Sequence, residues 1–548
     1  MSAAWIRPRL RRFAQQDDGS LIVFSLFLLL CMFLFTGLAI DVMRTETART
    51  KLQNTLDRAV LAAADLDQPL NAQDVVNDYF TRAGVDNFLA TVNPTSGLNF
   101  KTVEATASAE MGTRFIPLHH TALHQKHVGE MAGPGKLTAA ASGTANETVT
   151  DVEISLVLDN SGSMNSNNRL NLLKAAANDF LDIVIKDDGA SGPDDKVSIN
   201  IVPFATQVSA GPSLLSHFNV TTEHSYSHCV NFSASDFTSA SLSLTDELQR
   251  TGHFDVQSWT DVPRYGAMNN RYLTCPSGHD SVNTSGSNID SRYITFMGDD
   301  KDTLKSQINS MWAGGNTSID VATKWGLALL DPAARPIVND QIASGKVNAN
   351  FTGRPFSYTE DQVMKVLVVM SDGENTSQYT LRSDYRTGDS PLFRDSSNGR
   401  ETYYYNRSYT SYDYFYVNGD YWRTQPYYDW SRAQRMTWPE VWAYRSVASF
   451  SRYVQYEALG GSWANYYYSY WTSVTPSTKN TRTSQICQAA KDQGVTVYTI
   501  GMDTYGQGDA TLSDCATSTA FFFDVDGLEI GEAFAAIARD INRLRLTH

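Results

Sequence analysis

The sequence has few basic residues and no motif of the common hydrolases. Its formal net charge is −15, and no long basic run follows the first twelve residues, whereas nucleic-acid binding needs clustered Lys and Arg to neutralise phosphates. It contains no Gly-x-x-x-x-Gly-Lys-[Ser/Thr] motif and no Gly-x-Ser-x-Gly motif. Nucleotide hydrolysis and a serine nucleophile elbow are therefore not indicated. We expect neither a nucleic-acid-binding protein nor an enzyme, and we assign no catalytic residue.

Cysteine is also scarce, with five in 548 residues. No Cys-x-x-Cys pair occurs, which argues against a structural zinc site. Cys31 lies within a long apolar run and is expected to be free. The other four form an even set, as in exported proteins with disulfides. Three pairings are possible, and proximity in the sequence favours Cys229 with Cys275 and Cys487 with Cys515.

The most informative polar motif follows the apolar run 152–158, which is typical of a buried parallel strand. After it come Asp159, Ser161 and Ser163, three oxygen-bearing side chains at every second position. A turn at the end of the strand would direct one carboxylate and two hydroxyls to a common point. Hard cations such as Mg²⁺ prefer oxygen ligands of this kind. Taken alone, the motif is a weak signal and is more typical of an ordinary polar loop, because loops rich in Ser and Asn are common.

Two later segments supply further oxygen ligands. A glycine pair precedes Thr317, which stands at the start of a helix expected over 319–330. A second apolar run, 366–370, leads directly to Asp372. Open α/β sheets bind ligands beyond the carboxyl ends of their strands. We therefore expect Thr317 and Asp372 to lie close to the first motif and to form one metal site with it.

This ordered set resembles the metal-ion-dependent adhesion site of von Willebrand factor type A domains. The resemblance implies that Asp159, Ser161, Ser163, Thr317 and Asp372 surround the metal, some directly and some through water. It implies Mg²⁺, with Mn²⁺ and Ca²⁺ as alternatives, and no other cofactor. It also implies a doubly wound, mostly parallel α/β sheet of Rossmann-like type, and a protein partner that presents an acidic residue to the metal.

Two segments interrupt the expected α/β pattern, at about 207–299 and 376–481. The second holds 19 of the 27 tyrosines and 6 of the 10 tryptophans. Tyrosine is common at recognition surfaces, but these rings could equally pack a small subdomain. Around the insertions, periodicity predicts helices over 169–185, 301–312, 319–330, 483–492 and 528–546, and strands over 152–158, 197–204, 363–370, 495–501 and 521–525.

A candidate membrane anchor lies near the N-terminus. Residues 21–40 carry no charge, and about twenty apolar residues span a bilayer as a helix. Four arginines precede the run and Asp41 follows it, which favours a cytoplasmic N-terminus. A cleaved signal peptide is the alternative, but its apolar region is usually about 7–15 residues. Here a helical pattern over 42–65 continues the run, so we favour an uncleaved anchor.

The anchor resembles the N-terminal segment of TadE/TadG-like proteins, which belong to tight-adherence (Flp-type) pilus assembly systems. The resemblance rests on 12–13, 17–20, 37–41, 48–53 and the alanine-rich stretch 57–64. Prepilins of these systems carry Glu at the fifth position after the cleaved Gly. Here Phe24 is the fifth residue after Gly19, which favours a permanently anchored assembly protein over a pilin subunit.

The combined prediction is a single-pass protein of the bacterial inner membrane with its bulk in the periplasm. We expect a cytoplasmic tip (1–19), a transmembrane helix (20–41), a TadE/G-like helix with a small α+β segment (42–150) and the A domain (151–548). In the small segment we expect an amphipathic piece over 75–88 and extended pieces over 102–109 and 137–150. The protein would bind pilus or secretion components through its metal site. The alternative is a surface-exposed adhesin that binds host or matrix protein through the same site.

Overall fold

The computed structural model divides into two units, Met1–Val149 and Thr150–His548, which are described separately. The predicted cytoplasmic tip, 1–19, lies outside the described residues. These comprise 20–65, 68, 70–96, 100–115, 135–148, 151–185, 196–256, 273–275, 292–360, 362–417, 419–426, 431–504 and 506–547.

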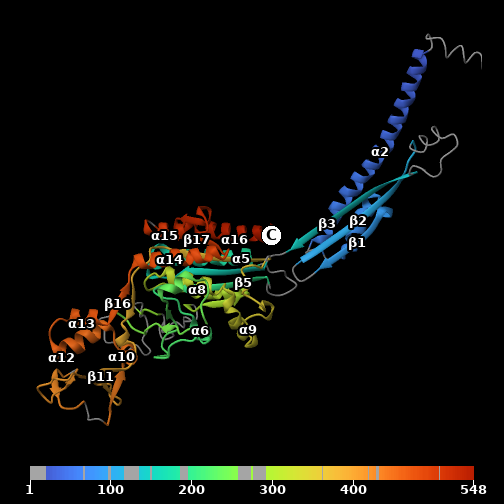
Figure 1. Ribbon diagram of the computed structural model, residues 1–548. Helices are drawn as coiled ribbons and strands as arrows, with labels where there is room; N and C mark the ends of the chain where they lie inside the picture. The colour runs from blue at the N-terminus through green and yellow to red at the C-terminus, as the bar shows by residue number, and fades with distance from the viewer. Residues whose placement is uncertain are drawn as a thin grey trace, which may run out of the picture. The chain divides into compact units, whose positions relative to one another are not determined.

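The first unit is built on one long helix, α2, from Ser20 to Ala64 (Figure 1). Its first half is long and apolar enough to cross a membrane, and most of its side chains are exposed. Its second half buries one stripe that includes Leu52, Leu56 and Val60. The predicted span and the predicted helix after it are therefore one continuous helix.

A small sheet packs on the second half of α2. Its order is β1-β2-β3 and both pairings are antiparallel. Small side chains on β2, among them Ala105 and Ala107, are buried against the helix. The expected amphipathic piece at 75–88 is a shorter helix, because Gly84 takes a left-handed φ of 65° and ends it. The elements are α3 (Ala72–Ala83), β1 (Leu89–Ser96), β2 (Phe100–Gly112) and β3 (Lys136–Thr148).

The second unit is organised around a six-stranded sheet with the order β18-β17-β9-β4-β5-β8. Five strands are parallel, and β8 joins the edge antiparallel to β5. The first interruption was predicted at about 207–299. It ends earlier than predicted, because β8 lies within this range and belongs to the central sheet. The strands are β4 (Asp151–Asp159), β5 (Val197–Phe204), β8 (Thr295–Gly298), β9 (Val363–Ser371), β17 (Thr496–Met502) and β18 (Phe522–Val525).

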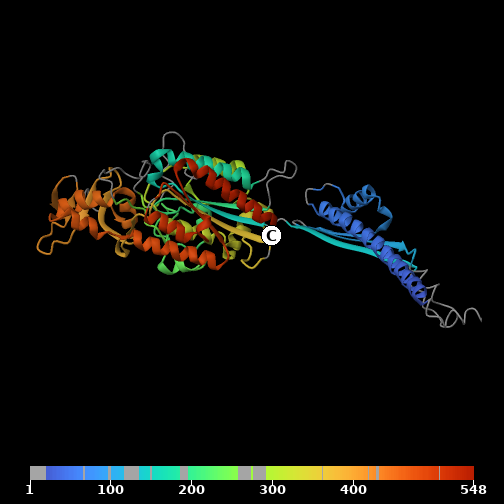
Figure 2. The same cartoon turned by 90° about the horizontal axis from the view of Figure 1, so that it is seen from above.

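Helices cover both faces of this sheet (Figure 2). Along β4, Leu156 packs toward α5, α7 and α16, whereas Val157 packs toward α8 and α14. This alternation gives the predicted doubly wound α/β fold. The main helices are α5 (Arg169–Val184), α7 (Lys301–Ser310), α8 (Ile319–Ala328), α14 (Pro476–Asp492) and α16 (Ile530–Thr547). Outside the two interruptions, two helices were not predicted from the sequence: α9 (Arg335–Ala343) and α15 (Gln507–Cys515).

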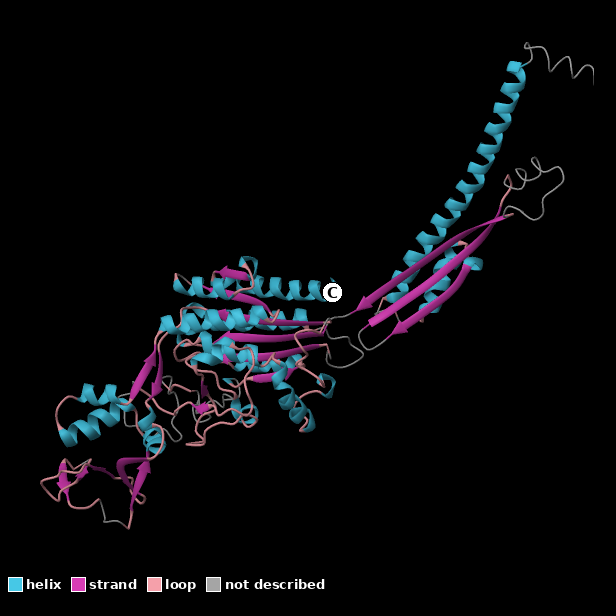
Figure 3. Ribbon diagram, in the orientation of Figure 1, coloured by secondary structure: helices cyan, strands magenta, loops and turns pink. Residues whose placement is uncertain are grey.

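The tyrosine-rich insertion forms its own sheets and short helices (Figure 3). The pairing of β10 with β16 joins its two ends, and a five-stranded sheet has the order β14-β13-β12-β11-β15. Trp438, Trp442 and Tyr470 are buried in its core, whereas Tyr409 and Tyr468 are exposed. The elements are β10 (Gln378–Leu381), β11 (Asp389–Asp395), β12 (Glu401–Tyr404), β13 (Tyr414–Tyr416), β14 (Tyr421–Arg423), β15 (Ala433–Thr437), α10 (Trp438–Tyr444), α11 (Val447–Phe450), α12 (Glu457–Leu459), α13 (Trp463–Ser469) and β16 (Trp471–Val474).

Both predicted disulfides are present. Cys229 is bonded to Cys275 within the first insertion, next to the short pair β6 (Val230–Asn231) and β7 (Gln249–Arg250). Cys487 is bonded to Cys515. The second bond joins two helices, because Cys487 lies in α14 and Cys515 is the last residue of α15. Cys31 is free.

Candidate metal centre

The two predicted metal-binding carboxylates lie at the ends of neighbouring strands. Asp159 is the last residue of β4, and Asp372 follows the last residue of β9. From β4 the chain continues to β5 on one side, and it later returns as β9 on the other side. The two strand ends therefore flank a topological switch point, where open α/β sheets bind ligands.

Hydrogen bonds connect four of the five predicted residues. Asp159 Oδ1 accepts from the backbone N–H of Ser161 at 2.7 Å, and the hydroxyls of Ser161 and Ser163 are 3.0 Å apart. Ser163 Oγ donates to Asp372 Oδ1 at 2.7 Å. Asp159 Oδ2 accepts from the hydroxyl of Ser371 at 2.6 Å. The side chains thus form one continuous cluster of oxygen atoms.

Thr317 lies on the loop before α8, which a backbone hydrogen bond to Gly315 joins to the loop of this cluster. Gly162 N–H donates to Gly315 O at 2.9 Å, which ties the loop after β4 to the loop before α8. Gly315 has a φ of 97°, a conformation that favours glycine. Thr317 N–H donates to Thr376 Oγ1 at 2.8 Å, and its carbonyl accepts from Lys479 Nζ at 2.5 Å. Within the described residues, the Thr317 hydroxyl has no hydrogen bond to the other four.

Burial makes the negative charges of this site costly. It raises the pKa of Asp159 to about 7, and repulsion from Asp372 adds to the shift. Burial also raises the pKa of Asp372, against the opposing effects of its bonds to Ser163 and Arg169. Arg169 donates to Asp372 Oδ2 at 3.1 Å and to Asp503 Oδ2 at 2.8 Å. One cation therefore already neutralises Asp372, whereas Asp159 has no ion pair within the described residues.

The donor set fits a hard cation. Two carboxylates and three hydroxyls offer only oxygen ligands, and Mg²⁺ usually takes one or two carboxylates and keeps several waters. A divalent cation would also stabilise both buried carboxylates in their charged form. Among the described residues, no group of three or more His, Cys, Asp or Glu side chains converges on a point. The described part of the chain thus offers no such cluster for zinc or another softer metal.

Four residues of this centre were not assigned to it from the sequence: Ser371, Arg169, Thr376 and Lys479. Ser371 was recognisable in principle, because it directly precedes Asp372 in the same strand-end motif. Arg169 stands at the start of the predicted helix 169–185, and Lys479 was assigned to the second interruption, so neither was expected near the site. Lys479 is nevertheless fully buried and donates to Ser318 Oγ at 2.6 Å and to Thr376 O at 2.8 Å.

Comparison with known proteins identifies the N-terminal part of the chain. The model of the Flp pilus-assembly TadE/G-like family matches residues 19–66. The N-terminal segment is TadE/G-like. The match includes the long helix α2 and ends just beyond it. No curated protein matches the chain.

Solved structures with a similar fold come from pilus and byssus proteins. The vWF domain of the type V pili tip protein Mfa5 from Porphyromonas gingivalis is 13% identical, over 72% of this chain and 96% of that domain, with a TM-score of 0.31. The pilus adhesin SpaC from Lactobacillus rhamnosus GG is 12% identical, over 82% of this chain and 34% of the adhesin, with a TM-score of 0.28. The mussel byssus protein PTMP1, with a zinc-occupied MIDAS motif, is 11% identical, over 72% of this chain and 46% of its own, with a TM-score of 0.25. The likeness concerns the fold alone.

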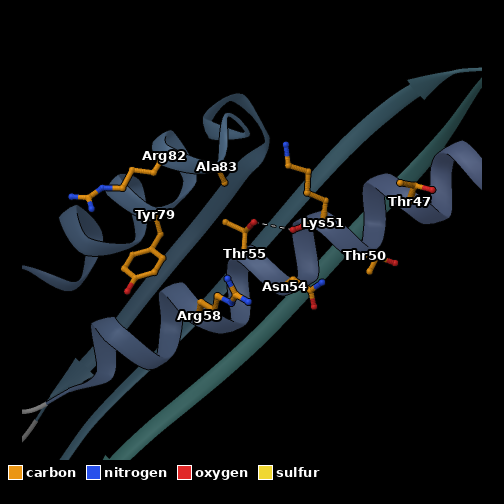
Figure 4. Close-up of a pocket in the computed structure, with 9 residues that line it drawn as sticks. All are labelled: Thr47, Thr50, Lys51, Asn54, Thr55, Arg58, Tyr79, Arg82 and Ala83. Carbon is orange, nitrogen blue, oxygen red and sulfur yellow. Dashed lines mark hydrogen bonds between the residues drawn. The ribbon is translucent and has the colours of Figure 1, made fainter.

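The TadE/G-like helix also borders a groove of about 730 Å³ between α2 and α3 (Figure 4). Three cations and no carboxylate line it, and the three threonine hydroxyls donate to carbonyls four residues earlier in α2. No acid–base pair is therefore available in this groove for catalysis. Its lining consists of Thr47, Thr50, Lys51, Asn54, Thr55, Arg58, Tyr79, Arg82 and Ala83.

Proposed function

We propose that this protein is an inner-membrane-anchored, periplasm-facing binding protein of a tight-adherence pilus assembly or secretion system. It holds a protein partner through a metal-ion-dependent adhesion site. The observation that carries the proposal is the cluster of Asp159, Ser161, Ser163 and Asp372 at the switch point of a von Willebrand A-type sheet, in a chain with a TadE/G-like N-terminal segment.

The proposed ligands of the cation are Asp159, Ser161, Ser163, Thr317 and Asp372. Mg²⁺ bound there would offer one coordination position to a carboxylate oxygen of the partner. Ser371 and the backbone of Ser161 orient the carboxylate of Asp159, and Arg169 orients that of Asp372.

The proposed topology places the N-terminus in the cytoplasm and the second unit in the periplasm. It is supported by the exposed apolar half of α2 and by the arginines that precede it. A partner would then be a component of the pilus or secretion machinery on the periplasmic side. Subcellular fractionation distinguishes this reading from a surface adhesin, which would be recovered from the cell exterior.

The direct test is capture of partners by the full-length protein in detergent, with Mg²⁺ and with a chelator. Asp159→Ala is compared with Asp246→Ala, which removes an exposed carboxylate from the same unit. We expect pilus components to be captured by wild type and by Asp246→Ala in Mg²⁺ only, and not by Asp159→Ala. Equal capture by Asp159→Ala in Mg²⁺ and in chelator would refute the adhesion-site mechanism.

A further inference from the structure

The apolar part of α2 ends at a buried acidic residue. Asp41 is the first charged residue after the run 21–40, yet only 1% of its side chain is exposed. Its carboxylate accepts the backbone N–H of Arg114 at 3.0 and 3.1 Å and that of Phe115 at 2.7 Å. Arg114 and Phe115 follow strand β2. The C-terminal end of β2 is therefore attached to α2 at the position where the apolar run ends.

Phe115 lies against the apolar run itself. A Cβ atom at Gly37 would lie 2.8 Å from both Cβ and Cγ of Phe115, so the ring occupies space that only glycine leaves open. Gly37 is about one helical turn before Asp41, within the uncharged run. Phe115 is still 39% exposed. Part of its ring therefore faces whatever surrounds the helix at this level.

We propose that Arg114 and Phe115 form a second membrane contact of this protein, at the outer leaflet of the lipid bilayer. Phe115 lies at the boundary between acyl chains and headgroups, and Arg114 lies among anionic lipid headgroups. This inference rests on the proposed membrane insertion of α2. It adds that the sheet of the first unit is docked on the bilayer rather than held away from it by the helix.

The geometry follows from the length of the apolar run. About twenty residues are needed to cross the hydrocarbon core, so a run of that length places Gly37 near its outer edge. A ring packed on Gly37 must lie at the same depth. Aromatic side chains favour this interfacial region, and arginine can extend its guanidinium to the phosphates. Arg44, 3.9 Å from Asp41 and 39% exposed, adds a second cation at this level.

Depth measurements with a nitroxide label test the contact in the full-length chain reconstituted in vesicles of phosphatidylcholine and phosphatidylglycerol. One sample carries the label on the native Cys31, inside the span. Two others combine Cys31→Ser with Phe115→Cys or with Tyr79→Cys. Tyr79 is a matched control, because it is 38% exposed and lies on α3 in the same unit.

We expect the labels at 31 and 115 to be relaxed by oxygen and protected from a water-soluble nickel chelate, and the label at 79 to show the reverse. A label at 115 that behaves like the label at 79, while the label at 31 is protected, overturns the inference and leaves the anchor intact. A label at 31 that is open to nickel overturns both the inserted anchor and this contact.

A second substitution tests the role of Gly37. Gly37→Leu should displace the labelled side chain at 115, because the added Cβ would lie 2.8 Å from the Cβ that Phe115→Cys retains, and the label should lose its protection from nickel. Ala39→Leu is the control, because Ala39 is exposed in the same run and should change nothing. Equal protection in both variants would overturn the proposed docking on Gly37.

The choice of lipid tests the headgroup assignment. The label at 115 should move deeper when phosphatidylglycerol is added to phosphatidylcholine, and Arg114→Gln combined with Arg44→Gln should abolish that shift. A depth that does not depend on phosphatidylglycerol would overturn the assignment to anionic headgroups.

Discussion

At the scale of single residues, the properties of Asp159 decide how the candidate metal centre behaves. Its carboxylate is fully buried and close to a second carboxylate, so charging it without a cation is unfavourable. Its hydrogen bonds to Ser161 and Ser371 hold it in place but supply no positive charge. A site of this kind gains stability either by binding a proton or by binding a metal ion.

We predict that chelated protein becomes less stable between pH 4 and pH 7 because of Asp159. Its pKa is about 7 when folded and about 4 when unfolded, so the folded state holds the proton more tightly. The resulting stabilisation is complete below the unfolded pKa. It is lost as the pH rises to the folded pKa, at no more than about 1.4 kcal/mol per pH unit.

Urea unfolding of wild type and Asp159→Asn across this pH range measures the effect. In chelator, the asparagine variant should gain stability relative to wild type as the pH rises, and Mg²⁺ should remove the fall in wild type. A difference between the two proteins that stays constant with pH would contradict this account of Asp159.

We predict that Lys479 positions the metal loop. Its ammonium donates to Thr317 O, Ser318 Oγ and Thr376 O, so Lys479→Met would remove one donor from each of these three buried oxygen atoms. We expect a loss of about 3 kcal/mol in stability and weaker Mg²⁺ binding. Lys491→Met in the same helix is the control, because Lys491 donates to Asp514 O in an exposed setting. Similar Mg²⁺ affinity in both variants would show that Lys479 is only structural.

At the scale of elements, apolar runs were sufficient to predict the central strands. Residues 152–158 and 366–370 are buried on both faces in β4 and β9, so their sequences are mostly hydrophobic, with Glu153 and Ser155 as the polar exceptions. The start of α14 was placed at 483 but lies at Pro476. Its first turns bury Lys479, which breaks the apolar periodicity on which the prediction depended. The four residues of β8 are too few to show a period.

The candidate site could also be predicted only in part from the sequence. The acidic and hydroxyl residues at strand ends could be predicted from order and spacing, because parallel strands bring their carboxyl ends to one edge. The contacts of Arg169 and Lys479 could not, because they join segments that are far apart in the sequence. Whether the tyrosines pack or face solvent also depends on tertiary structure: Tyr470 is buried and Tyr409 is 81% exposed.

We predict that residues 382–470 of the tyrosine-rich insertion contribute to partner binding and not to the metal site. Its ends are adjacent, since Leu381 of β10 pairs with Trp471 of β16, so a Gly/Ser linker can replace 382–470. Removing all of 376–481 would also delete Thr376 and Lys479 and disturb the metal loop. The variant should fold and bind Mg²⁺ normally but capture its partner more weakly.

The deletion variant should also carry substitutions of Phe254 and Val256. Both side chains pack in the core of the insertion, so its deletion would expose them. Changing both to Ser in the full-length chain provides the matched control. Partner capture that is unchanged by the deletion would show that the aromatic residues serve only the packing of the insertion.

At the scale of the whole molecule, the chain combines a candidate membrane helix with an α/β unit that has its own core. The sequence predicted this division because an uncharged run and an alternating strand–helix pattern are long signals. We predict that the protein fractionates with the inner membrane. In spheroplasts, added protease should remove a C-terminal tag and leave an N-terminal tag intact. Protection of the C-terminal tag would contradict the proposed orientation.

The central claim is that one divalent cation binds at the ends of β4 and β9. Calorimetric titration of the full-length protein with Mg²⁺ in detergent tests it most directly, using wild type, Asp159→Asn, Asp372→Asn and Asp246→Asn. We predict one binding event per chain in wild type and in Asp246→Asn, and none in the other two variants. Mg²⁺ binding of equal affinity in Asp159→Asn and wild type, or no binding in wild type, would contradict the account.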